Sequence, residues 1–304
     1  MTRDLLVLTN ALTDLVRAGT DEEVARRGLR KGHAHSNDDH FRESDLNNCR
    51  LVHGGSPGNV AAGAAHLGLA CGLIGSVGTD EIGRSYVADI AARGIESHLR
   101  TLDGPSGVCW VLVTPDGERT MAVDLGVSPD FSIPVEVFPR YRAFHCSGYE
   151  MVSNPEATWK AIETARREKL LLSFDVADAQ MVRLRPDDLR RATDGADVVF
   201  ANEHEARAIT EREPEEALVA MSRPGRQVVV KLGARGSLVW SGGKTWRIPS
   251  RATKVVDTTG AGDAYAAGFL SAFLRGAGAE ECGVRGTEFA ARICAIEGAR
   301  LPVR

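Results

Sequence analysis

The chain has 304 residues, of which 43% are hydrophobic and 26% are charged, and its formal net charge at pH 7 is −4. This length is enough to build the core of one large α/β domain. The mildly acidic balance argues against nucleic acid and anionic membranes as partners, because both are bound through basic patches.

Cysteine usage and the N-terminus indicate a reduced, cytoplasmic protein. The six cysteines are scattered without a CxxC pair, and the first residues lack the apolar region of a signal peptide. Residues 59–79 contain no charged side chain, but the glycines at positions 68, 72 and 75 divide this stretch. A buried helix followed by a strand is therefore favoured there over a membrane span.

The chain opens with a short apolar strand at residues 5–8, and a polar region without a parallel-sheet pattern follows at residues 11–53. This region contains a dense group of histidines and aspartates, namely His33, His35, Asp38, Asp39 and His40. Such a group suggests zinc, but a solvated loop is the simpler interpretation and the one that we favour.

From about residue 70 onward, short apolar strands alternate with helical segments. The expected strands lie at residues 70–74, 143–147, 170–175, 198–201 and 227–232, and the expected helices lie at residues 57–67, 81–93 and 154–168. Continuous apolar runs are typical of strands that are covered on both faces. The alternation predicts a mostly parallel sheet in a three-layer α/β/α sandwich, as a single domain over residues 1–304.

Two pairs of expected strands are antiparallel hairpins. Residues 108–113 and 119–123 flank a Pro-Asp-Gly turn, and two further strands within residues 239–246 flank a Gly-Gly turn. The Gly-Lys-Thr at residues 243–245 is not a phosphate-binding Walker A loop, because Leu238 stands where that motif requires its first glycine.

The most informative stretch is residues 255–270 (VVDTTGAGDAYAAGFL), which reads as a strand end, a glycine loop and a helix start. The N–H groups of Gly260, Ala261 and Gly262 can converge on one spot, where the positive end of the helix dipole favours an anion. Asp263 places a carboxylate beside that spot, and the same dipole is expected to lower its pKa. An anion pocket with a base at its edge suits phosphoryl transfer to an alcohol.

A second glycine-containing stretch lies at residues 53–83 (HGGSPGNVAAGAAHLGLACGLIGSVGTDEIG). Gly54 and Gly55 permit a close backbone approach to a ligand, and Asn59 can both donate and accept hydrogen bonds to hydroxyl groups.

DTTGAGDAYAAGF closely resembles a signature of the ribokinase (PfkB) family of carbohydrate and nucleoside kinases, and residues 53–83 are similar to the N-terminal signature of that family. The resemblance covers nearly the whole chain in the expected order. It implies a ribokinase-like fold and an ATP-dependent, Mg²⁺-using kinase. It further implies that Asp263 is the catalytic base and that Gly260, Ala261 and Gly262 form the anion hole.

The resemblance assigns roles to other residues as well. Those implied to hold the substrate are Asn10, Asp14, Gly54, Gly55 and Asn59, and the polar Glu150 is expected to join them. Those implied to lie beside the nucleotide are Asn202, Lys231, Gly233, Gly236 and Thr258. Glu205, in an Asn-x-x-Glu motif, is implied to place magnesium through water, and Asp257 is implied to bind a monovalent cation, K⁺.

In the resembled family, strands from the regions that interrupt the βαβ alternation form a small β lid over the substrate. The corresponding segments here are approximately residues 11–19, 31–53 and 106–125. Both a monomer and a homodimer through the lid are compatible with this arrangement.

The substrate class stays open between a nucleoside and a small sugar. The Asn-x-x-x-Asp spacing of Asn10 and Asp14 is that of the adenosine kinase branch and favours a nucleoside. A polar lid segment at residues 32–37, and Glu150 where adenosine kinases carry phenylalanine, favour a free sugar or a polyol such as ribose, fructose or inositol. A non-catalytic sensor of sugar or nucleotide on the same fold is a third hypothesis, against which the intact Asp263 and its glycine loop argue.

Overall fold

The computed structural model describes residues 2–37, 40–46, 49–251 and 253–303. Its larger sheet has nine strands in the order β14-β13-β12-β11-β10-β9-β1-β5-β6. These strands are β14 (Lys244–Ile248), β13 (Ser237–Ser241), β12 (Gln227–Lys231), β11 (Val198–Asn202), β10 (Leu171–Asp175), β9 (Tyr141–Ser147), β1 (Arg3–Leu8), β5 (Cys71–Gly78) and β6 (Glu96–Leu102). The strands from β12 to β6 are parallel, and the β13–β14 hairpin is antiparallel.

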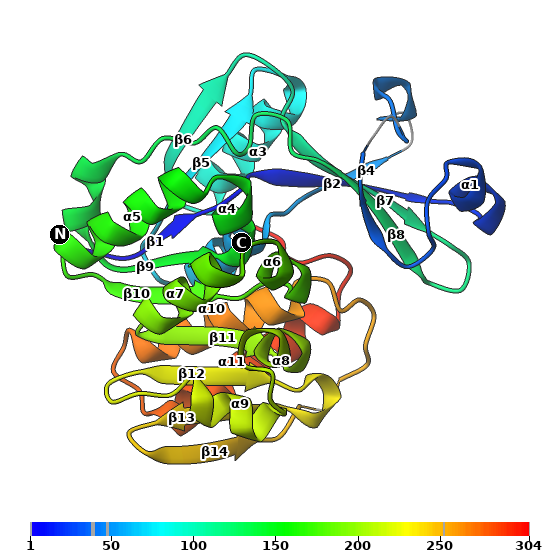
Figure 1. Cartoon of the computed structure of the whole chain (residues 1–304). Helices are drawn as coiled ribbons and strands as arrows, with labels where there is room; N and C mark the ends of the chain where they lie inside the picture. The colour runs from blue at the N-terminus through cyan, green and yellow to red at the C-terminus, as the bar shows by residue number, and fades with distance from the viewer. Residues whose placement is uncertain (1, 38–39, 47–48, 252, 304) are drawn as a thin grey trace.

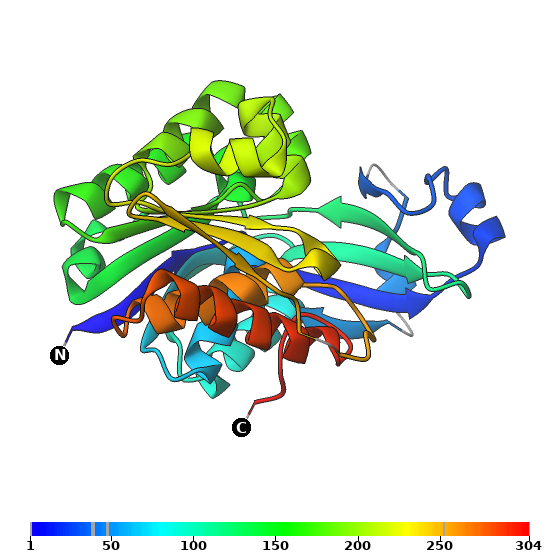
Figure 2. The ribbon, with the colours of Figure 1, turned by 90° about the horizontal axis from the view of Figure 1, so that it is seen from below.

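Helices cover both faces of this sheet (Figures 1 and 2). One face carries α2 (Ser56–His66), α3 (Glu81–Ala92), α10 (Ala261–Phe273) and α11 (Ala279–Cys294). The other carries α4 (Gly148–Ser153), α5 (Pro155–Arg167), α6 (Ala179–Leu184), α7 (Pro186–Gly195), α8 (Glu203–Thr210) and α9 (Pro214–Ala220). Because side chains alternate along β1, Leu6 and Leu8 join the core beneath α5, whereas Leu5 and Val7 join the core beneath α10. The predicted three-layer sandwich is therefore confirmed.

Two strands differ from the expected pattern. β6 was not predicted, because its sequence ESHLRTL is polar and it lies half-exposed at the edge of the sheet. β5 extends to Gly78, four residues beyond the predicted strand, and every residue of it is buried. The Gly-Ser-Val-Gly end of β5 has little strand propensity, so burial in the sheet determines its conformation.

A second sheet of five strands, in the order β3-β8-β7-β2-β4, projects from one end of the sandwich (Figure 1). Its strands are β2 (Leu12–Ala18), β3 (Ala34–Ser36), β4 (Arg50–His53), β7 (Gly107–Val113) and β8 (Arg119–Asp124), and α1 (Asp21–Arg26) lies beyond β2. The outer face of this sheet is buried against its own connecting segments: the Phe41 ring stacks on Trp110 at a centroid distance of 5.0 Å, and Leu15 and Val24 join the same cluster.

The two sheets meet where β1 leaves the sandwich and β2 enters the smaller sheet. The carboxyl ends of β1, β10, β11 and β12 and the N-termini of α2, α8 and α10 lie at this junction, which is where open α/β sheets bind their ligands. Within the described ranges, none of the helices has both the length and the apolar character needed to cross a bilayer.

Candidate active site

The glycine loop before α10 can be built only with glycine at its first position. Gly260 has a φ of +71°, and a Cβ atom there would lie 2.4 Å from the Cβ of Ala299. A Cβ on Gly262 would lie 3.2 Å from Nζ of Lys231, so this lysine reaches directly over the loop. The N-terminus of α10 and a buried ammonium group therefore flank the same space, which favours an anion there.

Asp263, in the first turn of α10, accepts hydrogen bonds on both carboxylate oxygens. Ser56 Oγ donates to Oδ1 at 2.7 Å, and Asn59 Nδ2 donates to Oδ2 at 2.9 Å. Burial raises the Asp263 pKa to about 6, although both hydrogen bonds and the Lys231 charge oppose this shift. The expected direction was therefore wrong: loss of solvation outweighs the helix dipole.

Lys231 forms a buried ion pair at the end of β10. Its Nζ lies 2.9 Å from Oδ2 of Asp175, which is almost fully buried. Ala177, two residues further on, has a φ of +73°, and this left-handed backbone of a non-glycine residue lies in the wall of the cavity described below. The ion pair fixes the lysine that lies above Gly262.

Asn202 and Glu205 form a capping box at the start of α8. The Asn202 side chain accepts from the backbone N–H groups of His204 and Glu205, and Glu205 Oε2 accepts from the Asn202 N–H at 2.6 Å. Asn202 Nδ2 also donates to Glu205 Oε1. Burial raises the Glu205 pKa to about 7, with the Lys231 charge opposing it. Asn202 and Glu205 both line the cavity described below. Asn202 was predicted to lie beside the nucleotide, and Glu205 was predicted to place magnesium.

Asp257, predicted to bind a monovalent cation, forms an ion pair with an arginine of the smaller sheet. Arg119 of β8 donates to Oδ1 and Oδ2 of Asp257, at 2.9 and 3.0 Å, and also to Thr259 Oγ1. Gly298 N–H donates to Oδ2 as well. The guanidinium group thus pairs with the Asp257 carboxylate, and it joins the smaller sheet to the glycine loop.

The residues predicted to hold the substrate meet at the junction of the two sheets. Gly55 has a φ of +81°, and a Cβ there would lie 2.4 Å from the Asn10 carbonyl oxygen, so glycine is required for this approach. A Cβ on Gly54 would lie 3.5 Å from Oδ1 of Asp14, which places the Asp14 carboxylate beside the Gly54 backbone. Burial raises the Asp14 pKa to about 6, and the charges of Arg119 and Arg300 lower it.

Glu150 does not have the predicted position facing the substrate. It is buried in the capping box of α4, where Oε2 accepts from Ser147 Oγ at 2.6 Å, and Oε1 accepts from the Asn10 N–H at 2.9 Å. Burial raises its pKa to about 7. The Glu150 carboxylate therefore caps the N-terminus of α4 with one oxygen and holds the backbone of Asn10 with the other.

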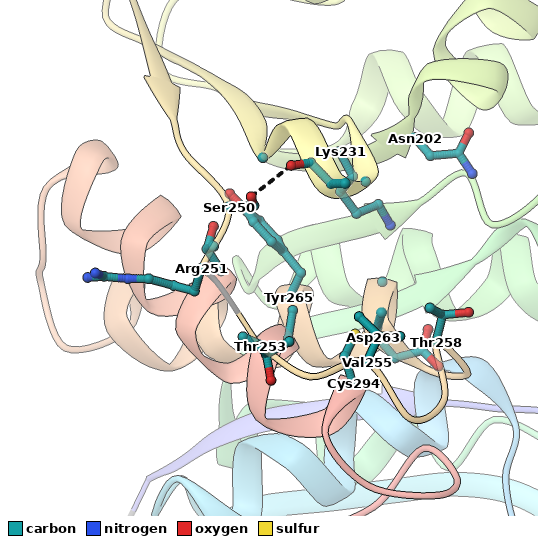
Figure 3. A pocket seen from close by; sticks show the side chains of 18 of the residues that line it. Asn202, Lys231, Ser250, Arg251, Thr253, Val255, Thr258, Asp263, Tyr265 and Cys294 are labelled. Carbon is teal, nitrogen blue, oxygen red and sulfur yellow. Dashed lines mark hydrogen bonds between the residues drawn. The ribbon is translucent and has the colours of Figure 1, made fainter.

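A cavity of about 680 Å³ extends from Asp263 between the glycine loop and the sheet (Figure 3). Lys231 and Asp263 point into it, and Thr258 lines it together with Gly233 and Gly236. Its wall also includes the apolar side chains of Val255, Tyr265, Ala290, Ala291 and Cys294. A site that combines charged groups with apolar side chains in one cavity fits a nucleoside polyphosphate.

Sequence reasoning missed Ser56, Asp175 and Arg300. Ser56 lies within the stretch HGGSPGN, whose glycines and asparagine were noted, while Asp175 ends a predicted strand. Of the histidine group, Asp38 and Asp39 lie outside the described residues. Among the described residues, no cluster of three or more His, Cys, Asp or Glu side chains has a metal-binding arrangement.

Comparison with known proteins gives consistent matches. A model of the pfkB family of carbohydrate kinases matches residues 36–304. An ATP-dependent ribose-1-phosphate kinase of Halopiger xanaduensis is 35% identical over 235 residues, which span 76% of this chain and 77% of that one. A nucleoside kinase of Methanothermobacter thermautotrophicus is 31% identical over 255 residues, which span 82% and 80%. The crystal structure of adenosine kinase from Sinorhizobium meliloti superposes with a TM-score of 0.88 at 30% identity, covering 99% of this chain and 96% of that one.

Proposed function

Because this chain belongs to the pfkB family of carbohydrate kinases, and is thus a phosphotransferase that acts on an alcohol group, we propose that it phosphorylates a primary hydroxyl of a nucleoside with ATP as donor. One observation carries the proposal: a carboxylate held by Ser56 and Asn59 lies in the first turn of α10, with Lys231 above the same glycine loop. This pairs an anion site with a proton acceptor.

The donor side of the site fits ATP. The apolar side chains of the cavity pack against the adenine ring, and the phosphates lie at the N-terminus of α10 beside Gly262 and Lys231. The Ala261 N–H, which was predicted to join them, instead donates to the Thr258 carbonyl at 3.1 Å. When bound, ATP supplies the phosphoryl group and Mg²⁺ balances part of its charge. Glu205 has a suitable oxygen donor for this ion, and since both of its oxygens already accept from Asn202, it would hold Mg²⁺ through water.

The acceptor side fits a diol with a primary hydroxyl group beyond it. Asp14 suits two adjacent hydroxyls, because its two carboxylate oxygens can each accept one of them. The carboxylate is largely desolvated, which makes such charged hydrogen bonds strong. Asp263 accepts the proton of the attacking hydroxyl. Its pKa of about 6 leaves it ionised at neutral pH and makes it a stronger base than an exposed aspartate.

The smaller sheet favours a nucleoside over a free sugar. In its strand register, Asp14 stands opposite both Val52 and Cys109, so all three side chains share the face turned toward the glycine loop. Apolar residues on this face include Val52, Met121 and Val123, which are partly exposed, and Cys109 and Val111, which are buried. A planar base would cover the partly exposed residues of this wall, whereas a sugar without a base would leave them uncovered.

We further propose that residues 11–19, 31–53 and 106–125 act as a lid within a single domain. The Arg119–Asp257 ion pair would hold this lid against the glycine loop. The chain is proposed to be a monomer, because the outer face of the lid is already buried by its own segments. Light scattering that gives a mass of one chain supports this, and a mass of two chains would contradict it.

The test of the substrate is ADP release with MgATP and a panel of acceptors: adenosine, cytidine, ribose, ribose 1-phosphate, fructose and inositol. We expect a nucleoside to give the highest kcat/KM. Turnover that is confined to the sugars, of which ribose 1-phosphate is the substrate named for the Halopiger relative, would replace the nucleoside in this proposal.

A further inference from the structure

Arg300 lies four residues before the end of the chain and belongs to none of the predicted motifs, but its side chain is buried against Gly54 and Asn59. Only 4% of its side chain is exposed. Nε donates to Asn59 Oδ1 at 2.8 Å, one terminal nitrogen donates to Asp89 Oδ2 at 2.9 Å, and the other donates to the Gly54 carbonyl at 2.6 Å. The C-terminal segment thus contacts the acceptor site at two places, the Gly54 backbone and the Asn59 side chain.

These contacts determine the orientation of the Asn59 amide. A guanidinium group has donors and no acceptor, so the amide oxygen must face Arg300. The amide nitrogen then faces the opposite way, and it donates to Asp263 Oδ2 at 2.9 Å. In the reverse orientation two donors would face each other, and the amide oxygen would face the carboxylate.

We propose that Arg300 is a positioning residue for phosphoryl transfer, which locks the Asn59 amide so that its N–H group holds the ionised carboxylate of Asp263. The proposal rests on the role of Asp263 given above. Arg300 acts through Asn59, and its hold on the Gly54 carbonyl keeps the α2 N-terminus in place for the same purpose.

Arg93 provides a matched control for the structural part of this role. It forms an ion pair with the same Asp89 at 2.9 Å, donates to the Leu301 carbonyl at 2.9 Å, and is 11% exposed. It therefore anchors the same C-terminal segment to α3 without a bond to Asn59. Loss of Arg93 weakens the anchor, whereas loss of Arg300 also releases the amide.

Other titratable groups act on Asp263 and must be separated from the effect of Arg300. Those that face it are Asp14 from β2, Tyr149 from α4, Asp175 from β10 and Lys231 from β12. Of these, Asp14 also feels the charge of Arg300, which lowers its pKa. A change in the pH dependence of kcat could therefore arise through Asn59 or through the effect of the Arg300 charge on Asp14. A separate experiment must distinguish these two causes.

The first measurement is the pH profile of kcat with MgATP and saturating adenosine, or whichever acceptor of the panel turns over fastest. Removing the Asn59 donor raises the Asp263 pKa, so Arg300→Met should move the acid limb upward by about one pH unit and lower kcat at pH 6 about fivefold. Arg93→Met should leave the limb in place and kcat within about twofold. An acid limb that moves equally in both variants would mean that Arg300 only anchors the C-terminal segment, which contradicts the positioning role.

The second measurement repeats Arg300→Met in an Asn59→Ala background. If Arg300 acts through Asn59, the double variant has the acid limb of Asn59→Ala alone. A further upward shift of similar size in that background would mean that the Arg300 charge acts on Asp14, which overturns the proposal.

Arg300→Lys keeps the test valid if Arg300→Met does not fold. Its ammonium group preserves the charge beside Asp89, but one nitrogen does not reach Asn59, Asp89 and Gly54 together, so the acid limb should still rise. A folded Arg300→Lys enzyme with the wild-type limb contradicts the proposal. Asp263→Asn, measured alongside, separates the two claims. If that variant keeps full kcat, Asp263 is not the base. If it has a low kcat but the Arg300 variants have the wild-type pH profile, only the positioning role of Arg300 is contradicted.

Discussion

Two opposed influences act on Asp263, and their balance decides its chemistry. The N-terminus of α10, Lys231, Ser56 and Asn59 all favour the ionised carboxylate, whereas burial favours the protonated one. Burial dominates, and the pKa rises to about 6. The active site therefore keeps a carboxylate that is less stable in the folded protein than in water, which is a common cost of function.

This imbalance predicts that Asp263→Asn stabilises the folded protein at pH 7.5, by about 1–2 kcal/mol. Since the folded pKa is raised, the native state binds more protons than the unfolded state between about pH 4 and 6. Wild-type stability therefore falls, relative to the variant, as the pH rises through this window. Urea unfolding at pH 4 and pH 7.5 measures the difference. A variant that is less stable than wild type at pH 7.5 would show that the hydrogen bonds dominate instead.

Asp14 predicts a different pattern, because its role is to bind rather than to transfer a proton. Asp14→Ala should raise KM for the acceptor far more than KM for ATP, at a cost of roughly 2–4 kcal/mol in kcat/KM for the lost charged hydrogen bonds. Steady-state kinetics with each substrate varied in turn provides the measurement. An unchanged acceptor KM would remove Asp14 from the site.

At the scale of elements, the glycine loop and α10 can be tested with two matched substitutions in one helix region. Gly260 and Gly276 both have a left-handed backbone, with φ of +71° and +86°, but a Cβ meets Ala299 only at Gly260 and finds open space at Gly276. Gly260→Ala should thus cost more than the roughly 1–3 kcal/mol of backbone strain expected for Gly276→Ala, and it alone should lower kcat. Thermal unfolding and kcat measured on both variants check this, and equal effects would argue against a tightly built loop.

The smaller sheet is the element that we expect to move. It projects from the sandwich (Figure 1). The Arg119–Asp257 ion pair holds it to the glycine loop. If it closes over the acceptor, hydrogen exchange in residues 11–19, 106–125 and the described parts of 31–53 should slow by about tenfold or more when acceptor binds. Protection confined to residues 257–270 would contradict a moving lid.

At the scale of the whole molecule, the sequence predicts the sandwich because its strands are buried and continuous, as in β10 and β12. Asp263 and its loop are predictable because the glycines, the carboxylate and the helix start are contiguous. Arg300 is not, because its partner Asn59 lies 241 residues away and neither neighbour of Arg300 carries a motif. Glu150 shows the converse: its position in the sequence suggested a ligand contact, and local capping of α4 explains it instead.

The central claim, that Asp263 is the base of an alcohol-phosphorylating kinase, is tested most directly by kcat of Asp263→Asn with MgATP and the best acceptor of the panel. The account predicts a fall of about 10²-fold or more with ATP affinity and fold preserved, because the variant keeps the glycine loop and Lys231 but has no proton acceptor. A folded Asp263→Asn enzyme that retains most of the wild-type kcat would contradict it.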